Sequence, residues 1–319
     1  MTFSSPWRDF GRLAISFLEA DDARHRYGSR MSLKGAKANV ARTAHLTAWA
    51  RALGRLTAGE AANGDYLAGR VLLPYQRALN RAPKLARWLL ERGLPGAFGY
   101  FNARTQYFDE VLLQEARAGL EQVVILGAGF DSRSLRFSDA MRTARVFEVD
   151  MPEVLTLRTE HLVRNQNTPA SAIAVPIDFE REDLGEALRE RGYASAARTL
   201  FLWEGVTYYL PEDAVKAILS LVASHSGPDS TILFDYVTRA FVDGDYSGYG
   251  ARRLADGWRR LGNVNRFGVD DIAAFMHPMG LRVQSDIDAG ELERRYLRSL
   301  PGPRARPWGC MRIAHATRL

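Results

Sequence analysis

Two glycines lie where a ligand could approach the main chain. Gly127 and Gly129 fall in the segment 126–131, directly after the apolar run 123–126. Glycines at a turn between a strand and a helix allow tight backbone geometry and close approach of a ligand. A dinucleotide fingerprint would have a third glycine where this chain has Ser132. The segment therefore predicts a cofactor turn and argues against a nicotinamide cofactor.

Asp150 ends the next apolar run, about 20 residues after the glycines. A carboxylate at the end of the second strand can accept hydrogen bonds from both ribose hydroxyls of an adenosine group. Nicotinamide and S-adenosylmethionine enzymes share this spacing, so it does not separate them. We favour Asp150 over Glu148 as the ligand because it comes last in the strand. A solvated strand end is the alternative.

A third acidic residue, Glu204, follows the apolar run 199–203. A carboxylate this close to a buried strand end needs a partner. An ammonium group or a cationic ligand would supply one, and a salt bridge to an arginine such as Arg104 is the alternative. Tyr208 and Tyr209 come just after Glu204, and we expect them to line the pocket of an acceptor.

These segments, at 124–133, 147–154 and 204–211, resemble the leucine carboxyl methyltransferase family of S-adenosylmethionine-dependent enzymes, whose bacterial members include polyketide O-methyltransferases. Further matches, in order over roughly residues 40–236, lie at 103–109, 177–179 and, more weakly, 42–44 and 50–52. The chain departs from the family pattern at Ser132, where threonine is common, and at Asp65-Tyr66, where the family has Asp-Pro. Substrate identity does not carry over.

The resemblance implies a role for each matched residue. Arg104 would hold the methionine carboxylate of the cofactor and Glu204 its amino group. The other implied cofactor residues are Gly127 and Gly129 at the backbone turn, Asp150 at the ribose, and Asp178 with Phe179 at the adenine. A guanidinium suits a carboxylate because it can bind both oxygens at once.

Alternating strands and helices must position these residues. Short apolar runs predict strands at 123–126, 146–149, 172–177, 199–203, 231–234, 281–285 and 308–316. Helical patterns cover 32–55, 66–79, 83–91, 102–118, 152–163, 180–191, 211–224 and 269–279. This alternation predicts an α/β fold with a doubly wound sheet.

The fold that we expect is a Rossmann-like class I methyltransferase with a mostly parallel, seven-stranded sheet and an N-terminal helical lid. Residues 1–119 would form the lid that caps the substrate, and 120–319 the S-adenosylmethionine-binding part, with an insertion at about 237–266.

Composition narrows the classes of function. The 319 residues carry a net charge of +6, and arginines dispersed among acids account for 39 of the 43 basic residues, so nucleic acid is not an expected partner. Cys310 is the only cysteine, which excludes an intrachain disulfide and a cysteine zinc cluster. No apolar stretch reaches the length of a signal peptide or of a membrane span. We expect a soluble, cytoplasmic protein without a metal.

The predicted function is S-adenosylmethionine-dependent O-methylation of a hydroxyl or carboxylate on a small natural product, polyketide-like. The open alternatives are a cofactor-binding protein of the same fold with lost or different chemistry, a protein carboxyl methyltransferase and an RNA methyltransferase. No histidine lies in a recognisable motif, so no catalytic base is assigned. The sequence gives neither the acceptor nor the oligomeric state.

Overall fold

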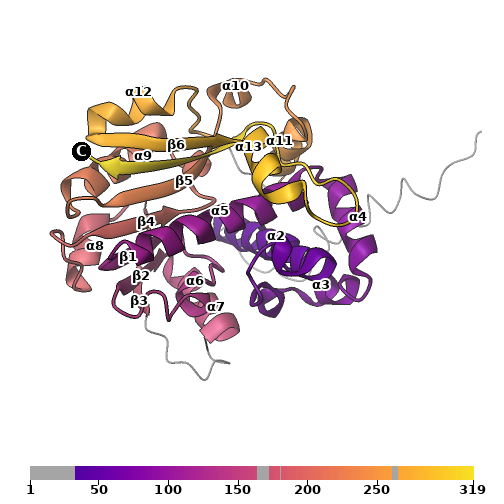
Figure 1. The fold of residues 1–319 in the computed structure, drawn as a ribbon, viewed down its shortest axis with the longest axis horizontal. Coiled ribbons are helices and arrows are strands. Elements are labelled where there is room, and N and C mark those ends of the chain that lie inside the picture. Colours follow the sequence, from indigo (N-terminus) through magenta and orange to yellow (C-terminus); the bar gives the residue numbers. More distant parts are fainter. Residues whose placement is uncertain (1–32, 164–171, 180, 261–264) are drawn as a thin grey trace, which may run out of the picture.

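A computed structural model describes residues 33–163, 172–179, 181–260 and 265–319, with side chains from Thr43 onward (Figure 1). Residues 1–32 of the predicted lid, Glu180 and residues 261–264 of the predicted insertion lie outside this part of the chain. None of the described helices is both long enough and apolar enough to cross a bilayer.

All seven predicted strands are present, and they form one sheet in the order β3-β2-β1-β4-β5-β7-β6. They are β1 Gln122–Leu126, β2 Arg145–Asp150, β3 Ala172–Pro176, β4 Thr199–Trp203, β5 Thr231–Val237, β6 Leu281–Asp288 and β7 Met311–Arg318. Of the seven strands described, β7 is the one that runs opposite to the others, so its pairs with β5 and β6 are antiparallel. The predicted α/β fold with a mostly parallel, seven-stranded sheet is therefore confirmed.

Both faces of the sheet are covered, which explains why its strands are continuous apolar runs. In β1, Val123 and Ile125 join the core on one face, whereas Val124 and Leu126 join the core on the other. The helices are α2 Leu33–Ala58, α3 Pro74–Leu79, α4 Pro83–Gly93, α5 Ala97–Arg117, α6 Arg133–Arg136, α7 Pro152–Arg158, α8 Leu184–Glu190, α9 Glu212–Ser224, α10 Arg239–Val242, α11 Ala251–Arg260, α12 Ile272–Met276 and α13 Ala289–Leu292. Side chains of α8, α9 and α12 pack in the second core, and those of α2, α4, α5 and α11 pack in the first.

Helix boundaries differ from the predicted ones for local reasons. The predicted helix 66–79 is a 3₁₀ turn at Ala68–Val71 followed by α3, because Pro74 has no N–H to continue a helix and instead starts a new one. Helix α5 begins five residues before the predicted start, directly after Gly96, whose φ is +99°. The described part of the predicted insertion holds α10 and α11.

The order of the strands reverses beside β1, whose neighbours are β2 on one side and β4 on the other. Ligands of open α/β sheets bind outside the carboxyl ends of the strands at such a point. Helix α5 crosses in front of the sheet in Figure 1 and packs against β4. The fold thus brings α5 to the place where the predicted cofactor residues gather.

Candidate active site

The glycine turn follows β1 and rests on β2. The N–H of Gly127 donates to the carbonyl of Val149 at 2.8 Å. Gly127 has a φ of +67°, and a Cβ there would lie 2.4 Å from Cγ2 of Val206, so a larger residue does not fit without a shift. Gly129 also has a positive φ, +45°, but a Cβ there would meet nothing closer than 3.8 Å. The main chain at Gly129 is therefore open to a ligand.

Asp150 is a buried carboxylate at the end of β2. It accepts the N–H of Gly129 and the N–H of Met151, each at 2.7 Å. Burial raises the pKa of Asp150 to about 6, although both hydrogen bonds act to lower it. No salt bridge to Asp150 is present within the described residues. A desolvated carboxylate without a paired cation complements neutral donors such as the hydroxyls of a ribose diol.

Glu148, the other carboxylate of β2, is already engaged. Nε of the buried Arg158 donates to Oε2 of Glu148 at 2.6 Å, and Ser134 Oγ donates to Oε1 at 2.5 Å. Arg158 also donates to the carbonyl of Asp131 in the glycine turn. Arg158 therefore links Glu148 to the glycine turn and stabilises that turn. Asp150 remains the carboxylate of β2 that is available to a ligand.

Asp178 and Phe179 follow β3 beside Asp150. The N–H of Ile177 donates to the carbonyl of Asp150 at 3.0 Å, which joins the ends of the two strands. The side chain of Asp178 is 39% exposed and lies 3.6 Å from Arg181 Nε. Phe179 is half-buried and packs on the core of the α8 and α9 face. An exposed carboxylate and an aromatic wall thus stand at the position implied for the adenine.

Arg104 of α5 and Glu204 after β4 lie against each other in the interior. Arg104 is 3% exposed, and its Nε lies 2.9 Å from Oε1 of Glu204. Burial would raise the pKa of Glu204, but the guanidinium groups of Arg133 and Arg104 lower it to about 2. Glu204 is therefore ionised at neutral pH. The salt bridge that the sequence left as an alternative is present.

The contact between Arg104 and Glu204 is an ion pair rather than an aligned hydrogen bond. Nε of Arg104 is buried and lies 2.9 Å from Oε1 of Glu204, but its N–H does not point at that oxygen. The two opposite charges therefore satisfy each other by attraction in the interior.

Asp235 is a site residue that the sequence did not indicate. It lies in β5 with no exposed surface and accepts three hydrogen bonds. The donors are Tyr100 Oη at 2.7 Å, Arg104 Nη1 at 2.6 Å and the N–H of Gly205 at 2.6 Å. The sequence feature that could have indicated Asp235 is an acidic residue inside the apolar run 231–237, because a charge buried in a strand requires a partner.

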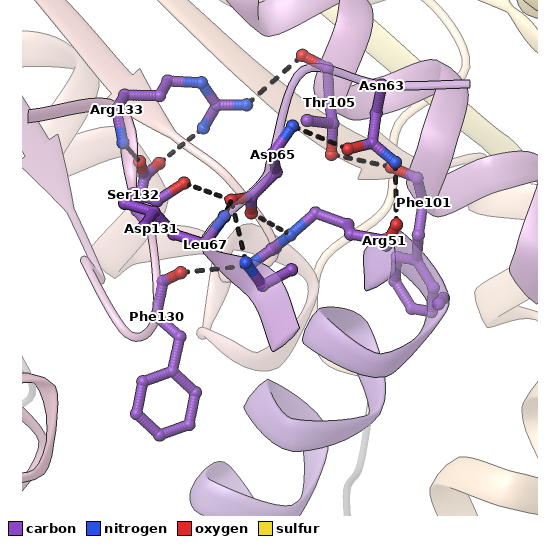
Figure 2. Close-up of polar contacts among 12 residues, drawn as sticks. Arg51, Asn63, Asp65, Leu67, Phe101, Thr105, Phe130, Asp131, Ser132 and Arg133 are labelled. Atoms are coloured by element: carbon purple, nitrogen blue, oxygen red, sulfur yellow. Dashed lines mark hydrogen bonds and ion pairs between the residues drawn. The ribbon is translucent and has the colours of Figure 1, made fainter. Parts of the chain in front are cut away.

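A polar network joins the N-terminal helices to the glycine turn (Figure 2). Asp65 accepts the hydroxyl of Ser132 at 2.7 Å and lies 2.8 Å from Nε of Arg51. Nη2 of Arg51 donates to the carbonyl of Phe130 at 3.0 Å. On the other side of the turn, Arg133 Nη1 binds Glu204 Oε2 at 2.6 Å. Asp65, the part of the Asp-Pro pattern that this chain keeps, therefore contacts Ser132, where the family commonly has threonine.

Aromatic side chains surround the segment that follows Glu204. Tyr208 stacks on Trp258 of α11, with ring centroids 4.9 Å apart, and Tyr209 packs edge-on against both rings. Phe241 also packs on Trp258. Burial and the Asp235 carboxylate raise the pKa of Tyr208 and of Tyr209, so both phenols are protonated at neutral pH. They can donate hydrogen bonds to a substrate but are poor bases.

Two histidines, His45 and His161, pack against the ring of Phe130 beside the glycine turn. His45 Nδ1 lies 2.7 Å from the carbonyl of Val71, and burial lowers the pKa of His315 to about 4. His25 lies outside the described residues. Among the described residues, no group of three or more His, Cys, Asp or Glu is placed to hold a metal ion.

The donor set fits an S-adenosylmethionine molecule. Such a molecule carries one carboxylate, one ammonium, a ribose diol and a flat base. The carboxyl ends of β1 to β4, together with α5, place a buried guanidinium beside an ionised carboxylate, a buried carboxylate that has no salt bridge among the described residues, and an acid next to an aromatic ring. Each group of the cofactor thus has a chemically complementary residue.

Three comparisons with known proteins agree with this description. The family model of leucine carboxyl methyltransferase matches residues 44–223, more than half of the chain. A candidate S-adenosyl-L-methionine-dependent methyltransferase of Mycobacterium avium (strain 104) is 35% identical over 210 residues, which cover 61% of this chain and 63% of the relative. Another from Mycolicibacterium smegmatis is 42% identical over 134 residues, 42% of each chain.

Among solved structures, a candidate methyltransferase from Thermobifida fusca YX has the same type of fold. Its TM-score is 0.50 at 17% identity, with 84% of this chain and 94% of that chain covered. This chain spans less than two thirds of the length of the curated relatives described above. The comparisons therefore identify the family and the fold of the catalytic part, and leave the acceptor to be inferred.

Proposed function

The chain belongs to the leucine carboxyl methyltransferase family, and on that basis we propose that it transfers a methyl group from S-adenosylmethionine to an oxygen of a small acceptor. The acceptor would be a hydroxyl or a carboxylate of a natural product, polyketide-like in our proposal. The observation that supports this most is the pairing of buried Arg104 with ionised Glu204 at the carboxyl ends of the strands, since these charges complement the amino-acid part of the cofactor.

Each proposed cofactor residue would bind a different chemical group of S-adenosylmethionine. Arg104 and Glu204 would hold the carboxylate and the ammonium group, Asp150 the ribose diol, and Asp178 with Phe179 the adenine. Gly127 and Gly129 keep the main chain of the turn open for close approach. When bound, S-adenosylmethionine supplies a methyl group that its sulfonium has already activated. The residues therefore have to align the acceptor and exclude water rather than create a strong nucleophile.

We assign the acceptor to the aromatic side of the site. Tyr208, Tyr209 and Trp258 pack their rings together next to the segment that carries Glu204, and an acceptor bound beside this aromatic cluster would be flat or apolar. A carboxylate acceptor needs no base because it is ionised at neutral pH. A phenol acceptor, with a pKa near 10 in water, would benefit from one. The description of the family as carboxyl methyltransferases favours the carboxylate.

The N-terminal helices would act as the lid. Arg104 is on α5, and the contacts of Asp65 with Ser132 and of Arg51 with Phe130 attach the helical part to the glycine turn (Figure 2). We infer that these contacts hold the cofactor turn against the lid, over the described residues 33–119 of the proposed lid.

Methyl transfer can be tested with isotope-labelled S-adenosylmethionine. The panel contains small aromatic and aliphatic carboxylic acids, phenols, a peptide with a free C-terminal carboxylate and an RNA oligonucleotide. We expect label in a small-molecule product only. Release of labelled methanol in mild alkali identifies a methyl ester, whereas an ether keeps its label. Label in the peptide or the RNA would instead support those alternatives, and cofactor binding without transfer to any member would favour a binding protein.

Asp150 gives the cofactor affinity a defined pH dependence. Its pKa in the folded protein, about 6, is above its ordinary value, so at lower pH Asp150 carries a proton that it has to release before its carboxylate can bind the neutral ribose diol. Affinity for S-adenosylhomocysteine should rise with pH, by up to about tenfold per unit, until about pH 6 and then level off. Between about pH 4 and pH 6, Asp150 binds a proton more tightly in the folded chain than in the unfolded chain. The free energy of unfolding of the unliganded protein should therefore fall as pH rises through this range.

Calorimetric titration at several pH values measures this effect. Asp150→Asn should bind more weakly at neutral pH by about 1–3 kcal/mol and lose the pH dependence. Because Asn cannot titrate, a pH dependence that persists in this variant would have to come from another group, such as His45 beside Phe130.

A further inference from the structure

Asp235 joins the parts of the site that have to hold the amino-acid end of the cofactor. Its Oδ2 accepts from Arg104 Nη1 and from Tyr100 Oη, and its Oδ1 accepts the N–H of Gly205. The main-chain carbonyl of Asp235 also accepts the hydroxyl of Thr207 at 2.5 Å. One fully buried residue of β5 therefore contacts α5, the residue after Glu204 and the turn that carries the two tyrosines.

These contacts fix the orientation of the Arg104 guanidinium. A guanidinium is planar, so holding Nη1 at 2.6 Å from Asp235 and Nε at 2.9 Å from Glu204 sets the direction of the whole plane. The rings of Tyr100 and Phe101 lie 5.3 and 5.2 Å from the guanidinium carbon and enclose it further. The guanidinium is thus oriented before a ligand arrives.

The same carboxylate sets the backbone beside Glu204. Gly205 has a φ of +79°, a conformation that other residues rarely adopt, and its N–H is held by Asp235 Oδ1. Glu204 precedes this fixed peptide and contacts Arg104 on one oxygen and Arg133 on the other. Asp235 thereby sets the spacing between the two charged groups that face the ligand.

We propose that Asp235 is a positioning residue, which holds Arg104 and Gly205 so that Arg104 and Glu204 match the carboxylate and the ammonium group of the cofactor. The inference rests on the proposed function. Asp235 itself touches neither the cofactor nor the acceptor in this account. It acts through Arg104, and its loss should harm recognition of the amino-acid part while recognition of the adenosine part by Asp150, Asp178 and Phe179 is kept.

Asparagine cannot replace Asp235 at this position. Its single carbonyl oxygen can accept from Gly205 or from Arg104 but not from both, and its NH₂ would face a second donor. Glutamate keeps the charge that Arg104 requires but is one methylene longer, so it cannot hold Arg104 and Gly205 in the present geometry. Both substitutions should disturb the positioning of Arg104 and Gly205, and asparagine should disturb it more than glutamate.

The test compares S-adenosylhomocysteine with 5′-methylthioadenosine, which keeps the adenosine and the thioether but lacks the amino-acid part. In Asp235→Asn, S-adenosylhomocysteine should bind about 30-fold more weakly or worse, and 5′-methylthioadenosine should stay within about threefold of the unmodified protein. Asp235→Glu, which retains the charge and is the variant to use if Asp235→Asn does not fold, should show the same pattern with a loss of about tenfold.

Asp286→Asn is the matched control. Asp286 of β6 also accepts a tyrosine hydroxyl, from Tyr236 at 2.8 Å, and binds an arginine, Arg312, at 2.8 Å, but it does not contact Arg104. The Asp286→Asn variant should bind S-adenosylhomocysteine and 5′-methylthioadenosine with the affinities of the unmodified protein. Equal losses for both ligands in the Asp235 variants, or an unchanged affinity for S-adenosylhomocysteine, would overturn the positioning role. If the unmodified protein binds neither ligand, the proposed function itself fails.

Discussion

Arg104→Ala is expected to weaken S-adenosylhomocysteine binding by about 2–4 kcal/mol and to lower the free energy of unfolding by about 3–5 kcal/mol. The binding loss follows from removing the group that would hold the ligand carboxylate. The stability loss has a separate cause. Asp235 has no exposed surface, and without Arg104 its carboxylate would stay buried with no cation beside it. The two losses are measured by calorimetric titration and by urea denaturation.

Two further variants separate binding from stability. Arg104→Lys keeps a positive charge near Asp235 but lacks the planar fork, so it should recover much of the stability and little of the affinity. Arg312→Ala removes a 28% exposed arginine that pairs with Asp286, and it should cost at most about 1 kcal/mol of stability and no affinity. Full affinity in a folded Arg104→Ala protein would remove Arg104 from the binding site.

Gly127→Ala is expected to be the most damaging single-methyl change at the turn. A φ of +67° costs a non-glycine residue about 1–2 kcal/mol, and overlap with Val206 Cγ2 at 2.4 Å adds about 1–3 kcal/mol. The summed loss of stability should appear in urea denaturation. Affinity for S-adenosylhomocysteine should fall as well, because the turn must shift away from β2 to relieve the overlap.

Gly129→Ala and the double variant Gly127→Ala/Val206→Ala test the two causes separately. Gly129 has a positive φ but open space beside it, so its substitution should show only the conformational cost. Trimming Val206 should restore the part of the loss that comes from overlap and leave the rest. If Gly127→Ala is no more destabilising than Gly129→Ala, the contact with Val206 does not constrain the turn.

The sheet could be predicted because its signals are local. Each buried strand is a short apolar run between polar turns, and the seven runs coincide with the seven strands. The interruption of the predicted helix 66–79 was harder to predict. Pro74 is compatible both with the first turn of a helix and with a break, and in the structure it starts α3 after the extended residues Leu72 and Leu73.

The candidate site was only partly predictable for a different reason. Arg104 lies in a recognisable motif within α5, and Asp150 and Glu204 lie in recognisable motifs at strand ends. The structure places Arg104 and Glu204 in contact. Asp235 has no motif, since its importance comes from α5 and β5 meeting across 131 residues of sequence. The link from Asp65 to Ser132 is likewise a long-range contact. A single sequence carries no signal for such pairs beyond an acid placed where burial is expected.

Calorimetric titration of the unmodified protein with S-adenosylhomocysteine measures whether the candidate site binds this cofactor. We expect a one-to-one complex with a dissociation constant in the micromolar range, a binding free energy of about −8 kcal/mol, and no comparable binding of NADH. Binding of NADH in place of S-adenosylhomocysteine, or no binding of S-adenosylhomocysteine at millimolar concentration, would contradict it.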